Sequence, residues 1–312
     1  MIISQTGLTR KAKVNQIMKV LQGDLSERWR TWALLTVLAL AVSPVGAQNP
    51  ASNRADLLRD VAARLEDNRR HYGADSNRFV RPGLLADRTG RWVRIDAEAC
   101  GHKSPTPTEF YLVTARSGHD YEALAVSFAA GRDLHDALEF IGLPAGQPID
   151  AAARRYWPKG ERVQARFAWT DSNGTHQAAA EEMILDLRTG RPLPPRGLVF
   201  TGSRIVRLPG TDQTGYAADE REPQALAANF NHPDLVLDVP YQALQGDEYS
   251  HLVPNPQYPL AKGQPLTVTF TPEYPDGRRR VQELTLTLRP PAPDAPAVPR
   301  FDLSGDPVLR LT

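Results

Sequence analysis

Hydrophobic and polar residues alternate with a period of two over much of the chain, a pattern that is typical of half-buried β-strands. It appears first in residues 91–99, 109–115 and 121–129. The last two segments are separated by Arg-Ser-Gly-His, in which Gly118 can adopt the positive φ angle that tight turns need. The pattern therefore predicts three strands, the last two joined as a hairpin.

The same period predicts a second hairpin and further strands. Residues 161–169 place Val163, Ala165, Phe167 and Trp169 on one face, Asn173-Gly174 forms a turn, and residues 176–187 return. Other strands are expected at 196–206, 234–240, 265–274 and 278–290, and Pro275-Asp276-Gly277 would join the last two.

Two segments change to the spacing of an amphipathic helix. One covers about 53–70 and the other about 133–141, where Gly142 and Pro144 stop the pattern. The predicted fold is therefore α+β: a β-rich mixed or antiparallel sheet body, an amphipathic helix at about 133–141 packed on it, and an N-terminal amphipathic helix.

A further apolar stretch lies before these elements. Residues 28–48 combine a basic flank, a largely apolar run of eleven residues from Trp32 to Val42, and the small residues Val45-Gly46-Ala47. This order is typical of a secretory signal peptide, and the alternative, a membrane anchor, needs about 20 apolar residues. We predict cleavage after Ala47 and an exported protein, periplasmic or extracellular. The polar stretch before residue 28 is long, so translation from Met18 is an alternative start.

Composition refines this organisation. The 312 residues include 27 prolines, which favour short strands and loops over a helical bundle. We predict a signal peptide at 1–47, an N-terminal helical segment at 48–75, an α+β body at 76–289, and a proline-rich tail at 290–312.

Charge and cysteine content exclude several functions. The signal segment carries six basic and two acidic residues, so its removal changes the net charge from +1 to −3 and leaves no basic surface of the kind that nucleic acid requires. Cys100 is the only cysteine, which excludes a disulfide within the chain and an iron–sulfur cluster. No cofactor is predicted.

Glu122 is the most informative candidate site residue. If 121–129 is a strand, Glu122 shares a face with Leu124 and Val126, where a carboxylate must lie at the rim, pair with a cation or have a raised pKa. With His119 or another histidine it would act as an acid/base group or a metal ligand; the alternative is a structural ion pair that closes one end of the sheet.

Other candidates are weaker. His135 and Glu139 lie one helical turn apart and could bind one metal, but the second histidine of the metalloprotease helix motif is absent, so a solvent-facing pair is the preferred interpretation. Cys100 and His102 fit an idle thiol better than a nucleophile and base. Thr201 and Ser203 are weak candidates for a ligand-binding turn, and His232 is a weak candidate metal ligand in a proline-containing turn.

The order of segments resembles the YdjY-type family of exported bacterial proteins. The resemblance rests on "HDYEALAVS" followed by a helix and "IGLPAG", then on "LVFTGSRIV", "GYAADE" and "NFNHPDLVLDVP", and covers roughly 90–275. Some members carry a cysteine cluster near the position of 231–240, where this chain has none. The resemblance implies an exported protein of unassigned function and supplies no catalytic residue.

Two hypotheses follow. The first is a non-enzymatic exported module that binds a protein or a small molecule outside the cytoplasm, with no transmembrane anchor in the mature chain. The second is a metal-binding protein or hydrolase that uses Glu122 with histidines drawn from 119, 135, 232 and 251.

Overall fold

The computed structural model describes residues 50–248 and 250–274. The predicted signal peptide, the predicted strand at 278–290 and the proline-rich tail lie outside the described residues. Within the described part no helix is long and apolar enough to cross a membrane.

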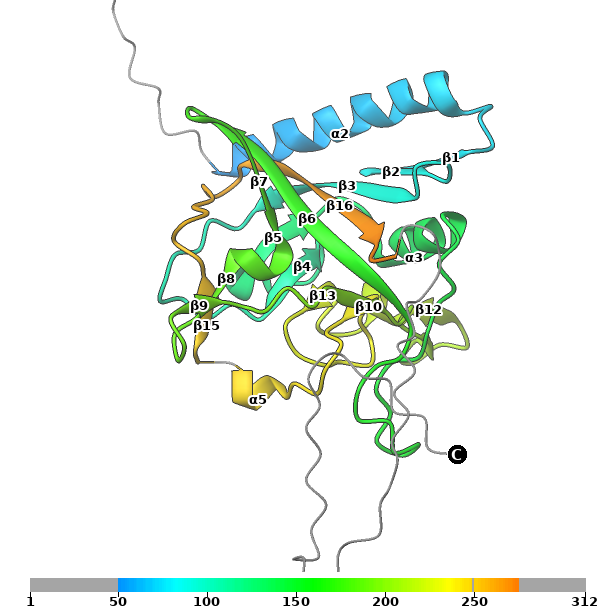
Figure 1. Ribbon diagram of the computed structural model, residues 1–312. Helices are drawn as coiled ribbons and strands as arrows, with labels where there is room; N and C mark the ends of the chain where they lie inside the picture. Colours follow the sequence, from blue (N-terminus) through cyan, green and yellow to red (C-terminus); the bar gives the residue numbers. More distant parts are fainter. Residues whose placement is uncertain (1–49, 249, 275–312) are drawn as a thin grey trace, which may run out of the picture. The chain divides into compact units, whose positions relative to one another are not determined.

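The main element of the fold is a sheet that closes on itself. Eight strands form a ring because the first and the last of them, β3 and β5, also pair with each other. The order around the ring is β3 (Trp92–Ala99), β16 (Pro265–Pro272), β6 (Glu161–Asp171), β10 (Leu198–Phe200), β14 (Leu237–Asp238), β13 (Ala225–Ala228), β4 (Phe110–Thr114) and β5 (Ala123–Ser127). Figure 1 shows β6 as the longest strand, crossing in front of the others.

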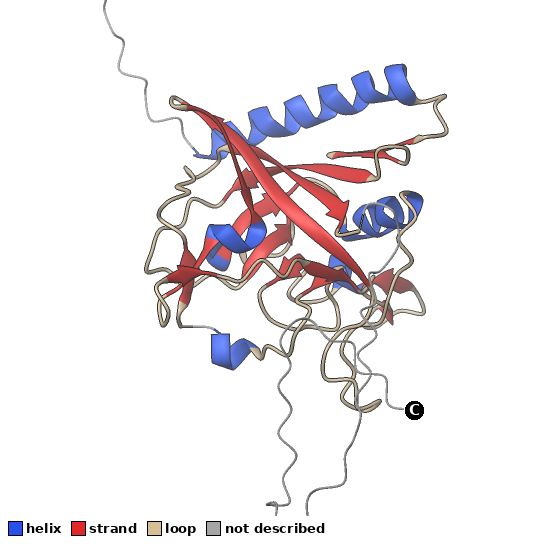
Figure 2. Cartoon of the chain, viewed as in Figure 1, coloured by secondary structure: helices blue, strands red, loops and turns tan. Residues whose placement is uncertain are grey.

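The predicted α+β sheet body is therefore wrong: the protein is a β-rich closed barrel. An open sheet needs a second layer to cover its apolar face, whereas a closed sheet buries that face against its own opposite wall. In Figure 2 the strands occupy the centre and the helices lie around them. The hydrophobic pattern of a strand is the same in both architectures, so the alternation could not separate them.

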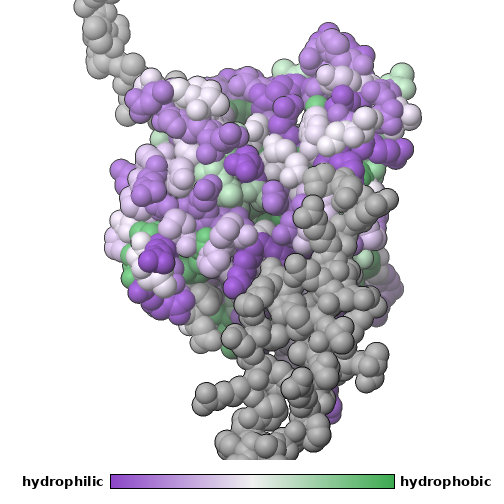
Figure 3. Space-filling model, in the orientation of Figure 1, coloured by the Kyte–Doolittle hydropathy of each residue, from purple (hydrophilic) through white to green (hydrophobic). Residues whose placement is uncertain are grey.

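The alternation itself does match the barrel core. Ile95, Val268 and Phe167 lie side by side in register on β3, β16 and β6, and each side chain is completely buried. Val163 and Phe167 on β6 are fully buried, as the predicted inward face requires. In Figure 3 the described residues of the visible face are mostly hydrophilic, with hydrophobic residues in small patches.

Of the two predicted hairpins, one is present and one is not. β6 pairs antiparallel with β7 (Gly174–Ala179), as predicted. β4 and β5 are instead parallel neighbours, with Phe110 opposite Ala123 and Thr114 opposite Ser127. Residues 115–122 therefore carry the chain back along the barrel, from the end of β4 to the level at which β4 begins.

The remaining elements surround the barrel. β1 and β2 extend the sheet beside β3, and two small sheets, β11–β12 and β15–β8–β9, lie apart from it. Their bounds are β1 (Arg78–Arg81), β2 (Leu84–Asp87), β8 (Ile184–Asp186), β9 (Arg191–Pro192), β11 (Ile205–Arg207), β12 (Thr214–Tyr216) and β15 (Leu252–Pro254). The helical segments are α2 (Pro50–Tyr72), α3 (Gly131–Phe140), α4 (Ala217–Glu220), α5 (Gln245–Glu248) and the 3-10 turns η1 (Asp120–Glu122) and η2 (Ala180–Met183).

The two long helices occur close to where the pattern predicts them. α2 buries Leu57 and Val61, and α3 buries Leu134, Ala137 and Leu138. They lie outside the barrel, so they cover its outer surface and are not the second layer of an open sheet.

Candidate functional site

The parallel pairing of β4 and β5 brings two glutamates together at one end of the barrel. Glu109 precedes β4, Glu122 precedes β5, and the backbone N–H of Glu109 donates to the carbonyl of Glu122 over 2.8 Å. Both residues are buried, with exposed fractions of 3% and 6%. Burial raises the pKa of Glu109; the hydrogen bond that it accepts from Gln245 lowers this pKa, and the nearby charge of Glu122 raises it further.

His119 lies between Glu122 and a third glutamate. Its Nδ1 is 2.6 Å from Oε1 of Glu122, and its Nε2 is 2.8 Å from Oε2 of Glu222. We call Glu122, His119 and Glu222 the carboxylate–histidine row. The alternation predicted Glu122 on a strand, but Glu122 ends the 3-10 turn η1. In such a turn residues three apart, here His119 and Glu122, lie on the same side.

The row favours a protonated imidazole. Two carboxylates accept from the ring, and only the charged form of histidine has a proton on both nitrogens. Burial lowers the pKa of His119, but the hydrogen bonds and charges of Glu122 and Glu222 together outweigh this effect, so the pKa is raised. Glu122 thus has a cationic partner, which is one of the explanations that its position required.

The outer end of the row faces solvent. The Glu222 side chain is 75% exposed, whereas that of Glu122 is 8% exposed. Tyr121 is also exposed, and its ring centroid lies 5.8 Å from that of His119. An acidic group and an aromatic ring are therefore both exposed at this surface.

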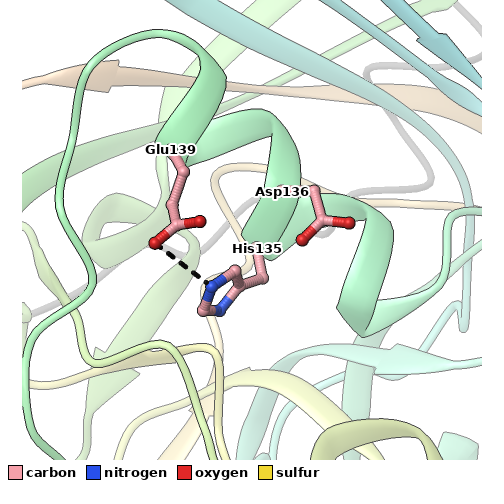
Figure 4. A group of neighbouring side chains, drawn as sticks. All are labelled: His135, Asp136 and Glu139. Carbon is pink, nitrogen blue, oxygen red and sulfur yellow. Dashed lines mark ion pairs between the residues drawn. The ribbon is translucent and has the colours of Figure 1, made fainter.

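His135 lies elsewhere, on α3. Its Nδ1 is 3.0 Å from the carbonyl oxygen of Gly202, and its Nε2 is 3.5 Å from Oε1 of Glu139 (Figure 4). Asp136, the next residue on the helix, completes a group of three possible metal ligands. The structure thus places Glu139 beside His135, as the helical spacing predicts, and on a different element from Glu122.

Thr201 and Ser203 flank Gly202 beside His135. The Thr201 hydroxyl donates to the carbonyl of Leu235 over 3.0 Å, and the Ser203 hydroxyl donates to that of Asp234 over 2.8 Å. Because each hydroxyl proton is used by the backbone of 234–236, the two residues fix this loop.

The other two histidines named as candidates are outside the row. His232 is partly buried, burial lowers its pKa, and its Nδ1 accepts the backbone N–H of Asp234 over 3.3 Å. His251 is buried, and its backbone carbonyl accepts the N–H of Leu187 over 2.9 Å. The histidine that pairs with the Glu122 carboxylate is His119.

Cys100 and His102 do not form a nucleophile and base. Burial raises the pKa of the Cys100 thiol to about 12, so the reactive thiolate is scarce at neutral pH. His102 is used elsewhere, with its Nε2 2.5 Å from the carbonyl oxygen of Asp120.

Glu222 and Glu109 were not found by reasoning from the sequence. Glu222 is 103 residues from His119, and nothing in the local pattern links the two. Glu109 is the first residue of the predicted strand 109–115, and a carboxylate at the start of a strand is ordinarily solvated. The parallel pairing that buries it was the missing information.

Together the fold and the site define a β-barrel protein with a carboxylate–histidine row built on the segments that precede β5 and β13. Residues 84–215 match the family model of the YdjY domain, so the chain contains a YdjY domain and the resemblance seen in the sequence is confirmed over these residues. The segment "NFNHPDLVLDVP" lies beyond the match. No curated protein and no solved structure matches the chain significantly. The domain match includes β3 to β6 and β10, while β13, β14 and β16, which complete the barrel, follow it.

Proposed function

We propose that this protein is an exported, non-enzymatic binding module that holds its partner at the carboxylate–histidine row. One observation carries the choice of binding over catalysis: carboxylates engage both ring nitrogens of His119. A histidine that acts as a general base, or that binds a metal, needs one nitrogen with a free lone pair. The imidazolium form that the row favours has none.

The partner that suits this surface is a positively charged group, such as a basic segment of another protein. Glu222 and Asp120 are exposed acidic residues, and the exposed ring of Tyr121 has its centroid 5.8 Å from that of His119. Ammonium and guanidinium groups pair with carboxylates and lie favourably over aromatic rings. The net charge of −3 expected for the mature chain agrees with a basic partner.

Export is supported by the segment at 28–48, which has the basic flank, apolar run and small residues of a signal peptide. The test is to express the full chain in a bacterium, separate the cell fractions, and determine the N-terminal residue of the product. We expect an exported product that begins at Gln48. A product that stays in the cytoplasm with residues 28–47 intact would contradict this part of the proposal.

Binding is tested with three labelled peptides of equal length, rich in lysine, serine or glutamate, followed by fluorescence anisotropy. The lysine peptide should bind best, and Glu222→Gln or Tyr121→Ala should each weaken it roughly threefold, the size expected for one exposed charge or cation–π contact. Glu66→Gln is the matched control, because Glu66 is also an exposed glutamate in an ion pair, with Arg69 at 2.8 Å. Equal binding of the three peptides would refute the proposal.

A second candidate, hydrolysis with His119 as general base, is favoured by one distance. Oε1 of buried Glu122 lies 2.6 Å from Nδ1, as in sites where a carboxylate orients a catalytic imidazole. Rotation of the exposed Glu222 side chain would then free Nε2. Hydrolysis of chromogenic esters that increases in Glu222→Ala and disappears in His119→Ala would establish this function in place of the first.

A further inference from the structure

We propose that His135, Asp136 and Glu139 form a site for a divalent transition-metal ion of the Zn²⁺ type, separate from the carboxylate–histidine row. One ligand atom from each residue lies within 4.8 Å of the other two. All three residues belong to the same stretch of α3, and Figure 4 shows the Glu139 carboxylate above the His135 ring with Asp136 on the neighbouring face. An imidazole together with carboxylates suits zinc and its neighbours better than Mg²⁺ or Ca²⁺.

The contacts of His135 leave the correct nitrogen available. Nδ1 lies 3.0 Å from both the Gly202 carbonyl and the Tyr216 hydroxyl. The carbonyl can only accept, and the hydroxyl donates its own proton to that carbonyl over 2.7 Å, so both contacts favour a ring proton on Nδ1. In the neutral ring Nε2 then has a free lone pair, and this nitrogen points to Glu139. A ring N–H donated to a backbone carbonyl is the usual second contact of a histidine that binds a metal. His119 differs, since both of its nitrogens are held by carboxylates.

Two further contacts fix the ring in this position. It packs edge-on against Phe200 and Tyr216, with centroid distances of 5.3 and 5.5 Å, and the Tyr216 hydroxyl donates to the same Gly202 carbonyl over 2.7 Å. Gly202 permits the close approach, because a Cβ there would lie 3.0 Å from the ring carbon Cε1 of His135. A ligand that is already held in place loses little conformational entropy when a metal binds.

The spacing of the ligand atoms also fits a metal. Nε2 of His135 and Oε1 of Glu139 are 3.5 Å apart, which is long for a hydrogen bond. Two ligands that lie about 2.1 Å from a tetrahedral zinc are about 3.4 Å apart. The His135 side chain is 13% exposed and that of Glu139 is 50% exposed, so water can fill the remaining positions of the metal.

One contact opposes binding. Nε of Arg132 pairs with Oδ1 of Asp136 at 2.8 Å, and its guanidinium also lies over the Tyr216 ring. Asp136 must exchange this cation for the metal, and a positive charge nearby disfavours a second one. Removal of the Arg132 charge should therefore increase metal affinity, an effect that non-specific adsorption of zinc would not produce.

The test is isothermal titration of the purified chain with ZnCl₂, with Co²⁺ absorption as a second readout of coordination. We expect one site, loss of at least tenfold in affinity in both His135→Ala and Glu139→Gln, and a gain of roughly threefold in Arg132→Gln. Glu139→Gln changes an exposed residue, so it keeps the test valid if His135→Ala perturbs folding. His176→Ala is the matched control, because this histidine has its own carboxylate partner, Asp171, at 2.8 Å.

Three results would overturn the proposal. The first is the absence of saturable binding at zinc concentrations below about 1 mM, because a Kd of that size corresponds to only a very weak interaction. The second is binding that is unchanged in Glu139→Gln and His135→Ala but lost in His176→Ala, which would place the zinc elsewhere. The third is adventitious zinc only, with all variants alike.

Discussion

His119 and Glu222 are in contact although 103 residues separate them, with Nε2 2.8 Å from the Glu222 carboxylate. The pairings of the barrel explain the contact. β5, which follows His119, lies beside β4, and β4 pairs on its other edge with β13, which follows Glu222. Glu122 precedes β5 at the level where β4 begins, whereas Glu222 precedes antiparallel β13 near the level where β4 ends. His119, on the returning segment 115–122, joins the two, so the carboxylate–histidine row follows from the pairing of these three strands.

The first prediction concerns the charge of His119. Its pKa should lie above the ordinary value of 6.5, and Glu122→Gln and Glu222→Gln should each lower it. Because the folded pKa is raised, the row stabilises the fold fully below the unfolded pKa, and this contribution is lost as the pH rises through the folded pKa. NMR titration of the imidazole resonances checks the shift. A pKa that is unchanged in both variants would contradict the role of the carboxylates.

The second prediction concerns Asp238, which is completely buried. Burial raises its pKa from 3.8 to about 7, although Asn231 and the backbone N–H of Val239 donate to its carboxylate. Between these two values the folded chain holds a proton that the unfolded chain has released. The contribution of Asp238 to stability should therefore fall as the pH rises from about 4 to about 7, and stay constant above that.

Urea unfolding of the wild type and Asp238→Asn at pH 5 and pH 8 tests this pH dependence. Asparagine has the same shape and does not titrate, so the variant should gain on the order of 2 kcal/mol relative to the wild type between the two pH values. The other buried acids are common to both chains and cancel in the comparison. A difference that does not depend on pH would show that Asp238 is ionised in the folded protein throughout.

The sequence predicted the local features well. The alternation at 161–169 needed only neighbouring residues and appears in β6. The turn predicted at Asn173-Gly174 lies one residue earlier, at Ser172-Asn173, since Gly174 begins β7 and pairs with Asp171. The prediction at Gly118 was half right: its φ is +74°, as a turn requires, but the strands on either side are parallel. A return of eight residues is long enough to cross back along a five-residue strand, and the pattern does not record its direction.

The local sequence pattern could not predict the closure of the barrel or the partners of the site residues. Closure depends on the pairing of Ala97 with Ser127, and open and closed sheets have the same period. Glu122 was identified because a carboxylate beside apolar residues needs an explanation. Its partner, His119, is only three residues away in the sequence. The expected strand, however, placed the two side chains on opposite faces.

The third prediction concerns Asp219 and helix α3. The N-cap residue of α3, Ala130, makes no side-chain hydrogen bond to the helix. Asp219, 88 residues after Gly131, caps it instead: its carboxylate accepts from the backbone N–H groups of Gly131 and Arg132 at 2.6 and 2.9 Å. A negative group at this end also interacts favourably with the helix dipole. Asp219→Ala should therefore lower the free energy of unfolding by about 1–2 kcal/mol.

The control for this cap is Asp219→Asn, which keeps one accepting oxygen and should lose less. Chemical denaturation gives both values. Because α3 carries His135 and Glu139, Asp219→Ala should also weaken any metal binding there while leaving the ligands unchanged. If Asp219→Ala is as stable as the wild type, the helix start is held by its buried residues, such as Leu134, and the cap is unimportant.

The fourth prediction compares two glycines with nearly equal backbone angles. Gly101 has φ of +75° and Gly118 has φ of +74°, so an alanine at either position has the same left-handed strain, about 1–2 kcal/mol. Their surroundings differ. A Cβ on Gly101 would lie 2.4 Å from the backbone nitrogen of Lys262, whereas a Cβ on Gly118 would have no atom within 4 Å.

Gly101→Ala should therefore cost clearly more than Gly118→Ala, because the backbone at Lys262 cannot move without disturbing Gly263, whose N–H donates to the carbonyl of Ala99 over 2.8 Å. We expect a loss of roughly 3 kcal/mol or more at Gly101, against about 1 kcal/mol at Gly118. Thermal and urea unfolding of the two variants measures the difference. Both substitutions add one methyl group at nearly the same φ. The difference between their stability losses therefore measures the cost of the close contact between Gly101 and Lys262, which precedes β16. Equal losses would mean that the backbone at Lys262 shifts to accommodate the added methyl group.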